Sequence, residues 1–306
     1  CGGYNITSKY SFGNSNANLW AGYSNANPKE DMVSKEDYLL PDAVAKGSSS
    51  SGSDKENIGK YITASISNLT PKRTWMLRTS IEASKQWDNI LNGKTEYTSE
   101  YGNLAFDKTQ YSRSSTVKPT LYAYFQKQIG SSHNFDAVLD CYYADNKYNR
   151  DFLEGSRFVS DVDEDYFYGK FNANYSIALP KSNNLTFSLH EYMRVSQDSY
   201  GGSADYWQHL HSSETIFFVD YNKRWKKVML DFNPGLSYLV YRLHGDDAVK
   251  HVAPRLQLSS SWMPDKLQRV RLFFSLGNTF PSLNTVNNVS QQIDRIMIRR
   301  GNPDMD

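Results

Sequence analysis

Hydrophobic and polar residues alternate along most of the chain. Between Phe167 and Ile177 the odd positions are almost all apolar or aromatic, whereas the even positions, among them Lys170 and Asn174, are polar. A period of two places the two sets on opposite faces of a β-strand. The same alternation is clearest at 74–83, 117–126, 135–143, 185–195, 228–240 and 269–276. It recurs about a dozen times and therefore predicts an all-β protein.

The alternating segments have the length of strands that cross a membrane. Many run for about ten residues or more, and a tilted strand needs about 9–11 residues to cross a bilayer. The strands of soluble sandwiches average about five or six residues and turn their apolar face inward. The sequence therefore predicts a transmembrane antiparallel β-barrel, with lipid against the apolar face and water against the polar face.

The alternation assigns side chains to two faces. On the apolar face we expect lipid contacts from Phe125, Leu139, Phe171, Phe187, Leu230 and Leu272. On the polar face we expect lumen-facing side chains from Lys118, Asp140, Lys170, His190, Asp231 and Arg271. Glu191 breaks the pattern, because it falls on the apolar face. Either a bulge rotates the strand there, or Glu191 contacts a partner protein instead of lipid.

The composition agrees with a barrel. The mean hydropathy is −0.65, as expected when only every second residue of a strand faces lipid. The 22 Tyr, 15 Phe and 6 Trp residues suit aromatic girdles and a ligand-lined lumen. A net charge of +1 gives no reason to expect a nucleic-acid partner.

Short and long connections alternate between the predicted strands. Short turns are expected near 13–16, 68–73, 130–134, 180–184, 222–226 and 264–267, on the periplasmic side. Long extracellular loops are expected at 26–59, 86–115, 144–165, 196–212, 242–251 and beyond 279. Within the first of these, the Ser48–Ser53 run is expected to be flexible. This alternation predicts the orientation of the barrel in the membrane.

One predicted loop carries the candidate ligand site. Tyr200, Tyr206 and Trp207 lie among glycine, serine and aspartate residues, close to Arg194 on the preceding strand. Flat aromatic rings among hydroxyl and carboxylate groups are typical of sugar or peptide sites. The alternative is that these rings pack only on one another.

Metal and catalytic sites are not expected. The run Asp161–Asp165 resembles either a calcium site or a solvated hairpin end, and it lacks the pattern of an EF-hand loop. His209 and His211 share one strand face, but no further ligand follows at metal-site spacing, and an exposed loop is the simpler interpretation. There is no Gly-x-Ser-x-Gly elbow or Walker loop. We therefore expect neither enzyme activity nor a cofactor.

The end of the chain resembles a known family. The segments 281–289, 293–295 and 300–305 are similar to the long extracellular connection and Gly-Asn-Pro strand entry of TonB-dependent outer-membrane receptors of the Bacteroidetes type. Met305 stands where that family usually has leucine. The resemblance implies a barrel of roughly 22 strands closed by an amino-terminal plug. Residues 1–306 would then be about twelve strands of a partial barrel, and a complete barrel of about twelve strands is the alternative.

The same resemblance implies a function and a location. The protein would bind an extracellular nutrient and import it across the bacterial cell outer membrane with energy relayed by TonB. Its partners would be outer-membrane lipid, the TonB complex acting through a plug domain, and a surface lipoprotein or other outer-membrane subunits. The charges of the polar face would pair with the plug or contact the substrate. The alternative is a non-transporting barrel subunit or a passive pore.

Overall fold

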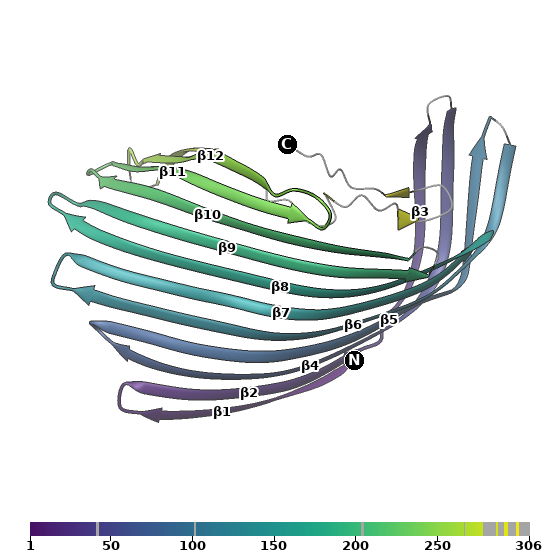
Figure 1. Ribbon diagram of the computed structural model, residues 1–306, viewed down its shortest axis with the longest axis horizontal. Coiled ribbons are helices and arrows are strands. Elements are labelled where there is room, and N and C mark those ends of the chain that lie inside the picture. The colour runs from purple at the N-terminus through teal and green to yellow at the C-terminus, as the bar shows by residue number, and fades with distance from the viewer. Residues whose placement is uncertain are drawn as a thin grey trace.

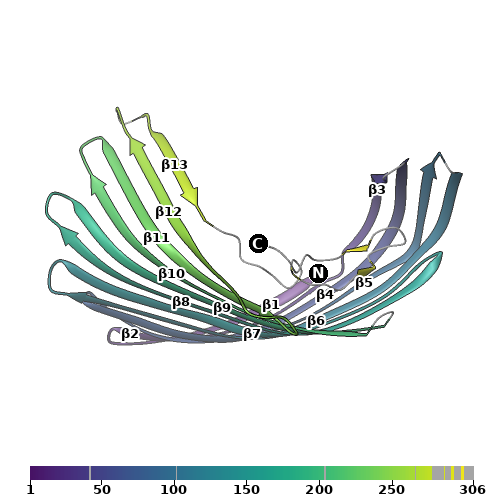
Figure 2. The same cartoon turned by 45° about the horizontal axis from the view of Figure 1, so that its top comes forward.

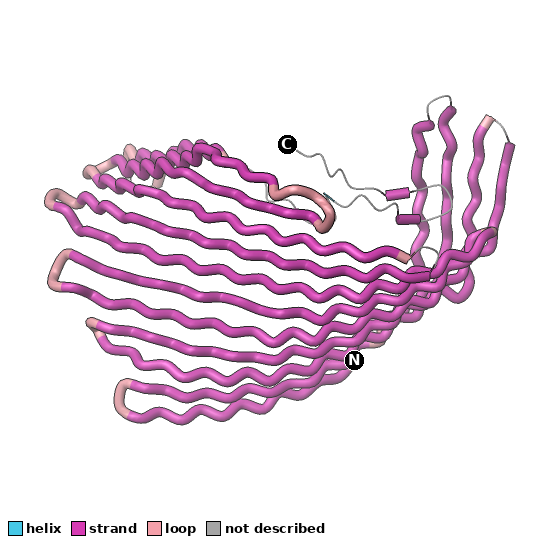
Figure 3. The backbone as a smooth tube through the Cα atoms, viewed as in Figure 1, coloured by secondary structure: helices cyan, strands magenta, loops and turns pink. Residues whose placement is uncertain are grey.

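A single antiparallel sheet forms almost the whole protein. The computed structural model describes residues 1–40, 43–100, 102–202, 205–265, 267–277, 286, 291–292 and 298–299. Within them the chain builds a 13-stranded sheet and a separate two-stranded sheet (Figure 1). The tube in Figure 3 is coloured as strand over nearly all of its described length. The predicted all-β class is therefore confirmed.

The strands follow one another in a meander. They are β1 (Gly2–Phe12), β2 (Ser15–Ala26), β3 (Lys29–Leu40), β4 (Ala43–Thr70), β5 (Arg73–Ser99), β6 (Gly102–Ile129), β7 (His133–Glu154), β8 (Ser156–Leu179), β9 (Asn183–Gly202), β10 (Tyr206–Arg224), β11 (Val228–Leu243), β12 (Val249–Trp262), β13 (Val270–Leu276), β14 (Gln291–Gln292) and β15 (Ile298–Arg299). β2 and β3 lie along two successive parts of the long strand β4. β1 and β13 end the order of the large sheet, so its described strands do not form a closed ring.

Tight turns connect successive strands at one common end of the strands, on the left in Figure 1. The connections at 13–14, 71–72, 130–132 and 180–182 are only two or three residues long, and all four lie within predicted turns. Gly13 and Gly130 have φ values of 58° and 68°. Glycine reaches such values without steric cost because it has no Cβ atom. None of the described residues forms a helix that is long and apolar enough to cross a membrane.

The predicted long loops at 26–59, 86–115, 144–165 and 196–212 are mostly strand, whereas the one beyond 279 lies largely outside the described residues. The Ser48–Ser53 run lies inside β4 and pairs with both β3 and β5. It is therefore not a flexible loop. The acidic run of 161–165 lies in β8, between β7 and β9. Backbone hydrogen bonds to strands on both sides hold such polar segments extended, whatever their composition suggests.

Cross-strand pairing keeps the two faces separate over the whole sheet. One row of directly opposed residues runs Tyr122, Asp140, Lys170, Tyr192 and Glu214 from β6 to β10. The pairing places the predicted polar set on this same face: Lys118, Asp140, Lys170, His190, Asp231 and Arg271. It places the predicted apolar set on the other: Phe125, Leu139, Phe171, Phe187, Leu230 and Leu272. The pairing thus keeps the two predicted sets on separate faces, and their contact with lipid or with a lumen stays a prediction.

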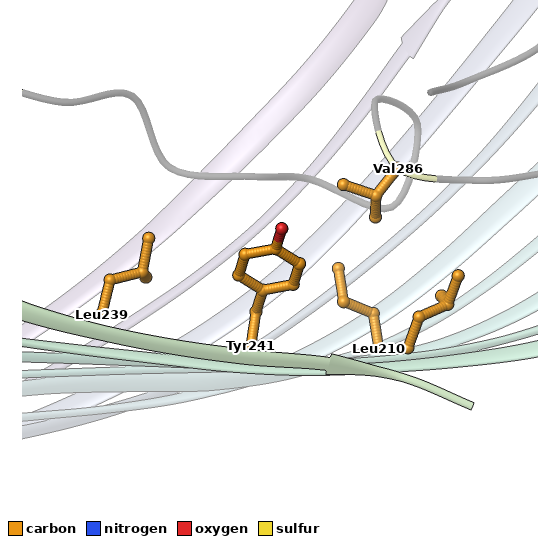
Figure 4. Close-up of a cluster of buried hydrophobic side chains, with 5 residues drawn as sticks. Leu210, Leu239, Tyr241 and Val286 are labelled. Carbon is orange, nitrogen blue, oxygen red and sulfur yellow. The ribbon is translucent and has the colours of Figure 1, made fainter. Parts of the chain in front are cut away.

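The sheet is strongly curved, and the polar face is its concave side. Figure 2 shows the strands rising on both sides of a trough. Val286 lies within the trough and is buried against Leu210, Leu239, Tyr241 and Leu243 (Figure 4). Leu239 is directly opposite Glu214 on the polar face. The polar side chains therefore line the hollow of the trough, and the apolar ones cover its outside.

The apolar covering ends abruptly on β7 and β8. On β7 it extends from Phe135 to Tyr143, and the next outward-facing residues are Asp145 and Lys147. β8 runs antiparallel to β7, and its outward-facing residue just before Phe167 is Asp165, opposite Asp145. We call the outward-facing residues between the tight turns and this boundary the apolar belt. Beyond the belt the same strands continue with mostly polar residues on both faces.

Candidate functional site

Aromatic and cationic side chains gather in the middle of the concave face. Strands β5 to β9 each contribute at least one of them, because in-register pairing places the even-numbered residues of these strands side by side. We call this group the tyrosine–cation surface. Its members are Arg78, Lys118, Tyr122, Tyr142, Tyr168, Lys170, Tyr192 and Arg194.

Each cation of this surface lies over an aromatic ring. The Lys118 ammonium is 4.3 Å from the centre of the Tyr142 ring, and the Arg78 guanidinium is 4.9 Å from that of Tyr122. Arg194 lies 5.8 Å from the ring of Tyr168. Such pairs hold long charged side chains in place against the rings. The surface is therefore suited to anionic or hydroxyl-rich molecules with a flat part that can stack.

The rings also contact one another. The centroids of Tyr142 and Tyr168 are 5.2 Å apart, and those of Tyr142 and Tyr166 are 5.8 Å apart. These separations are typical of favourable aromatic pairs. The sequence indicated a ligand-lined lumen through its aromatic content, but it did not single out these tyrosines, because the contacts join strands far apart in sequence.

The predicted ligand residues are only partly brought together. Tyr200 and Tyr206 are directly opposite each other on β9 and β10, with ring centroids 6.4 Å apart, on the concave face with Arg194. Trp207 points to the outer face, where its ring is 4.5 Å from that of His244. The three aromatic residues lie at the ends of paired strands and not in a long loop, so that part of the prediction is wrong.

A buried carboxylate lies beside Tyr200. Asp198 is only 5% exposed, and it accepts hydrogen bonds from the Ser196 and Tyr200 hydroxyls at 2.9 and 2.8 Å. Burial raises the pKa of Asp198 to about 6, and the nearby charge of Glu164 adds to this rise, while the two hydrogen bonds oppose it. Asp198 lies beyond the belt residue Val195. Its charge therefore changes in a mildly acidic range.

We expect this carboxylate to make stability depend on pH. Because the pKa is higher in the folded than in the unfolded chain, the folded state binds the proton more tightly, and stability falls as the pH rises from about 4 to about 6. The loss is at most about 3 kcal/mol. Asp198→Asn should remove it and raise stability at pH 7.5. Urea unfolding of the micelle-bound protein at pH 4.5 and 7.5 measures the difference.

An exposed neighbour provides the control for this experiment. Asp163→Asn changes an exposed carboxylate beyond the belt and should leave the pH dependence as in the parent protein. An equal change in both variants would contradict the assignment to Asp198.

A buried ion pair lies at the edge of the tyrosine–cation surface. The Arg255 guanidinium of β12 donates to the Glu214 carboxylate of β10. Their side chains are 11% and 7% exposed. Glu214 could not be recognised from the sequence, because β10 carries apolar residues on both faces and its alternation is weak. Ile216 and Phe218, for example, lie on the concave face with Glu214.

Glu191 remains on the apolar face, and the strand contains no bulge there. Its pairing with Phe171 on one side and Thr215 on the other continues the register without a shift. The Thr215 hydroxyl donates a hydrogen bond to the carboxylate. Of the two predicted explanations, the bulge is therefore wrong.

The described residues do not assemble a metal site. His209 and His211 lie on β10 and not in an exposed loop. Across the part of the chain that the structure describes, no three histidine, cysteine, aspartate or glutamate side chains group as metal ligands would.

The comparisons with known proteins identify no family for this chain. No family model matches the chain, and no curated protein matches it significantly.

Proposed function

We propose that this chain is the barrel wall of an outer-membrane receptor of the TonB-dependent type. The two-faced sheet carries the proposal: an apolar belt covers its convex side, and a tyrosine–cation surface lines its concave side. The belt on β7 spans about nine residues, which matches the length of a tilted strand in a bilayer. A soluble protein would bury such a surface instead of exposing Phe171 and Leu139.

The long strands support capture on the outside of the cell. Beyond the belt, β4 to β8 continue with mostly polar residues on both faces and extend the concave surface away from the membrane. The tyrosine–cation surface lies close to the boundary of the belt. It would meet a ligand that descends from the extracellular end, and the positive charges favour one that carries carboxylate or phosphate groups.

Uptake by cells that produce the full-length protein tests this proposal. The probes are a ferric chelate, cobalamin, an acidic oligosaccharide and a peptide, each labelled. We expect uptake of one class, and we expect a protonophore to abolish it. Tyr168→Leu removes the ring under Arg194 and should lower uptake at low ligand concentration about fivefold.

A tyrosine on the opposite face provides the matched control. Tyr175→Leu makes the same change on the outer side of β8 and should leave uptake within about twofold of the parent. Uptake that persists with the protonophore would indicate a passive pore. Absence of uptake for every probe, with normal insertion in the membrane, would indicate a non-transporting subunit.

One observation favours the second candidate, a barrel subunit of a larger assembly. Glu191 and Thr215 form a polar pair within the apolar belt. Carboxylates that face lipid are costly, and those that occur at such depth commonly contact protein. Crosslinking at position 191 in the native membrane, followed by identification of the attached protein, tests this candidate.

A further inference from the structure

A cationic hollow lies on the outer face of the sheet, directly beyond the apolar belt. Its cations are Lys85 of β5, Arg113 of β6 and Lys147 of β7. Ser115 is directly opposite Lys85 on one side and Lys147 on the other, and Arg113 is opposite Trp87. The hollow has a volume of about 410 Å³. Three strands therefore aim their positive charges at one depression.

These three cations have no charged partner among the described side chains of the protein. The structure shows no ion pair or hydrogen bond of Lys85, Arg113 or Lys147 with another described side chain, and all three are exposed. The carboxylates of the hollow belong to β8: Asp163 is directly opposite Lys147, and Asp161 accepts a hydrogen bond from Asn149. Lys85 and Arg113 therefore lie on the side of the hollow away from these carboxylates, and Lys147 lies between Ser115 and Asp163. An anionic group placed over Ser115 would have cations on three sides.

The position of the hollow indicates which anion it takes. Ala83 of β5 and Val117 of β6 are directly opposite each other on the outer face. They lie one outward-facing pair nearer to the tight turns than Lys85 and Ser115, and they belong to the apolar belt. A molecule bound here would touch cations with one part and apolar side chains with the part next to it. Trp87 adds an amphipathic ring at the same level, as is typical of membrane boundaries.

We propose that Lys85, Arg113 and Lys147 bind a phosphate group of a phosphorylated glycolipid in the outer leaflet, with its acyl chains on the apolar belt. The inference rests on the membrane location in the proposed function and does not depend on transport. Arginine and lysine form charge-assisted hydrogen bonds with phosphate oxygens. The Trp87 ring would pack beside the sugar.

Lipid binding by the full-length protein in detergent micelles tests the proposal. The probes are diphosphorylated lipid A and the same lipid without phosphates, and binding is followed by native mass spectrometry. We expect the phosphorylated lipid to bind at least about tenfold more tightly. The triple variant Lys85→Gln, Arg113→Gln, Lys147→Gln should lose this preference, and Lys147→Gln alone should weaken it about threefold.

A matched variant removes cations from the other end of the belt. Arg73→Gln, Lys127→Gln, Lys223→Gln changes three outer-face cations near the tight turns and should bind the phosphorylated lipid as the parent does. Equal loss in both triple variants, an unchanged preference in the first, or binding of inorganic phosphate without lipid preference would overturn the proposal. Failure of the parent to insert into bilayers would instead contradict the proposed membrane location.

Discussion

Replacing Arg255 with methionine is expected to lower the free energy of unfolding by about 3–5 kcal/mol. The substitution leaves the Glu214 carboxylate buried without its guanidinium partner. An unpaired buried charge loses its hydration and gains nothing in return, so the folded state bears the full penalty. Urea unfolding of the full-length protein in micelles, followed by tryptophan fluorescence, measures the change.

Two further variants separate this effect from lost packing. Lys55→Met breaks the 2.7 Å pair with Glu30, whose side chain is 54% exposed, and should cost less than about 1 kcal/mol. The double variant Glu214→Met, Arg255→Met removes both charges next to Leu239 and should regain most of the loss. If the double variant is as unstable as Arg255→Met, the cost comes from packing and not from charge.

The faces of the sheet could be predicted from the sequence because side chains along a strand alternate without exception. Lys170 and Phe171 fall on opposite faces whatever their neighbours do, provided that the strand is not interrupted. On β7, β8 and β9 no shift in pairing intervenes, so the predicted assignment holds. The register shifts at Gly52/Ser53 and Ile90/Gly93 lie in the distal parts of β4 and β5, beyond the predicted strands.

The length of the strands could not be predicted for a different reason. Asp161 and Asp163 face outward beyond the belt, and Glu164 faces the concave side. With polar residues on both faces, the hydrophobic pattern vanishes and the segment resembles a loop. Its strand structure depends on backbone pairing with β7 and β9, which the local sequence does not encode.

The sequence indicated that aromatic rings would contribute to a candidate site, but it did not indicate which residues come together. Aromatic content indicated stacking surfaces, but the predicted cluster around Trp207 is divided between two faces. The contacts of Tyr142 with Lys118 and Tyr168 join three strands, and only the register reveals them. On β10, Phe218 covers Gly235, where an added Cβ atom would lie 2.3 Å from the ring. This packing explains why an apolar residue occupies the polar face.

Two neighbouring residues of β7 test the central assignment of the faces. Leu139 lies on the apolar belt and is 36% exposed, whereas Val138 lies on the concave face opposite Tyr124 and Asn172. If the belt spans a bilayer as proposed, Leu139→Arg places a guanidinium in lipid near the middle of the belt and should cost about 2–4 kcal/mol. Val138→Arg introduces the same charge one residue away, where it can reach water in the trough, and should cost less than about 1 kcal/mol.

Insertion of the full-length protein into vesicles, measured as protection from protease and as unfolding in urea, compares the two variants. We expect Leu139→Arg to insert poorly and Val138→Arg to insert as the parent does. If the face exposed at Leu139 met water and the trough were the buried side, the order would reverse. That reversal would contradict the membrane-spanning sheet and, with it, both the proposed receptor and the lipid site on its outer face.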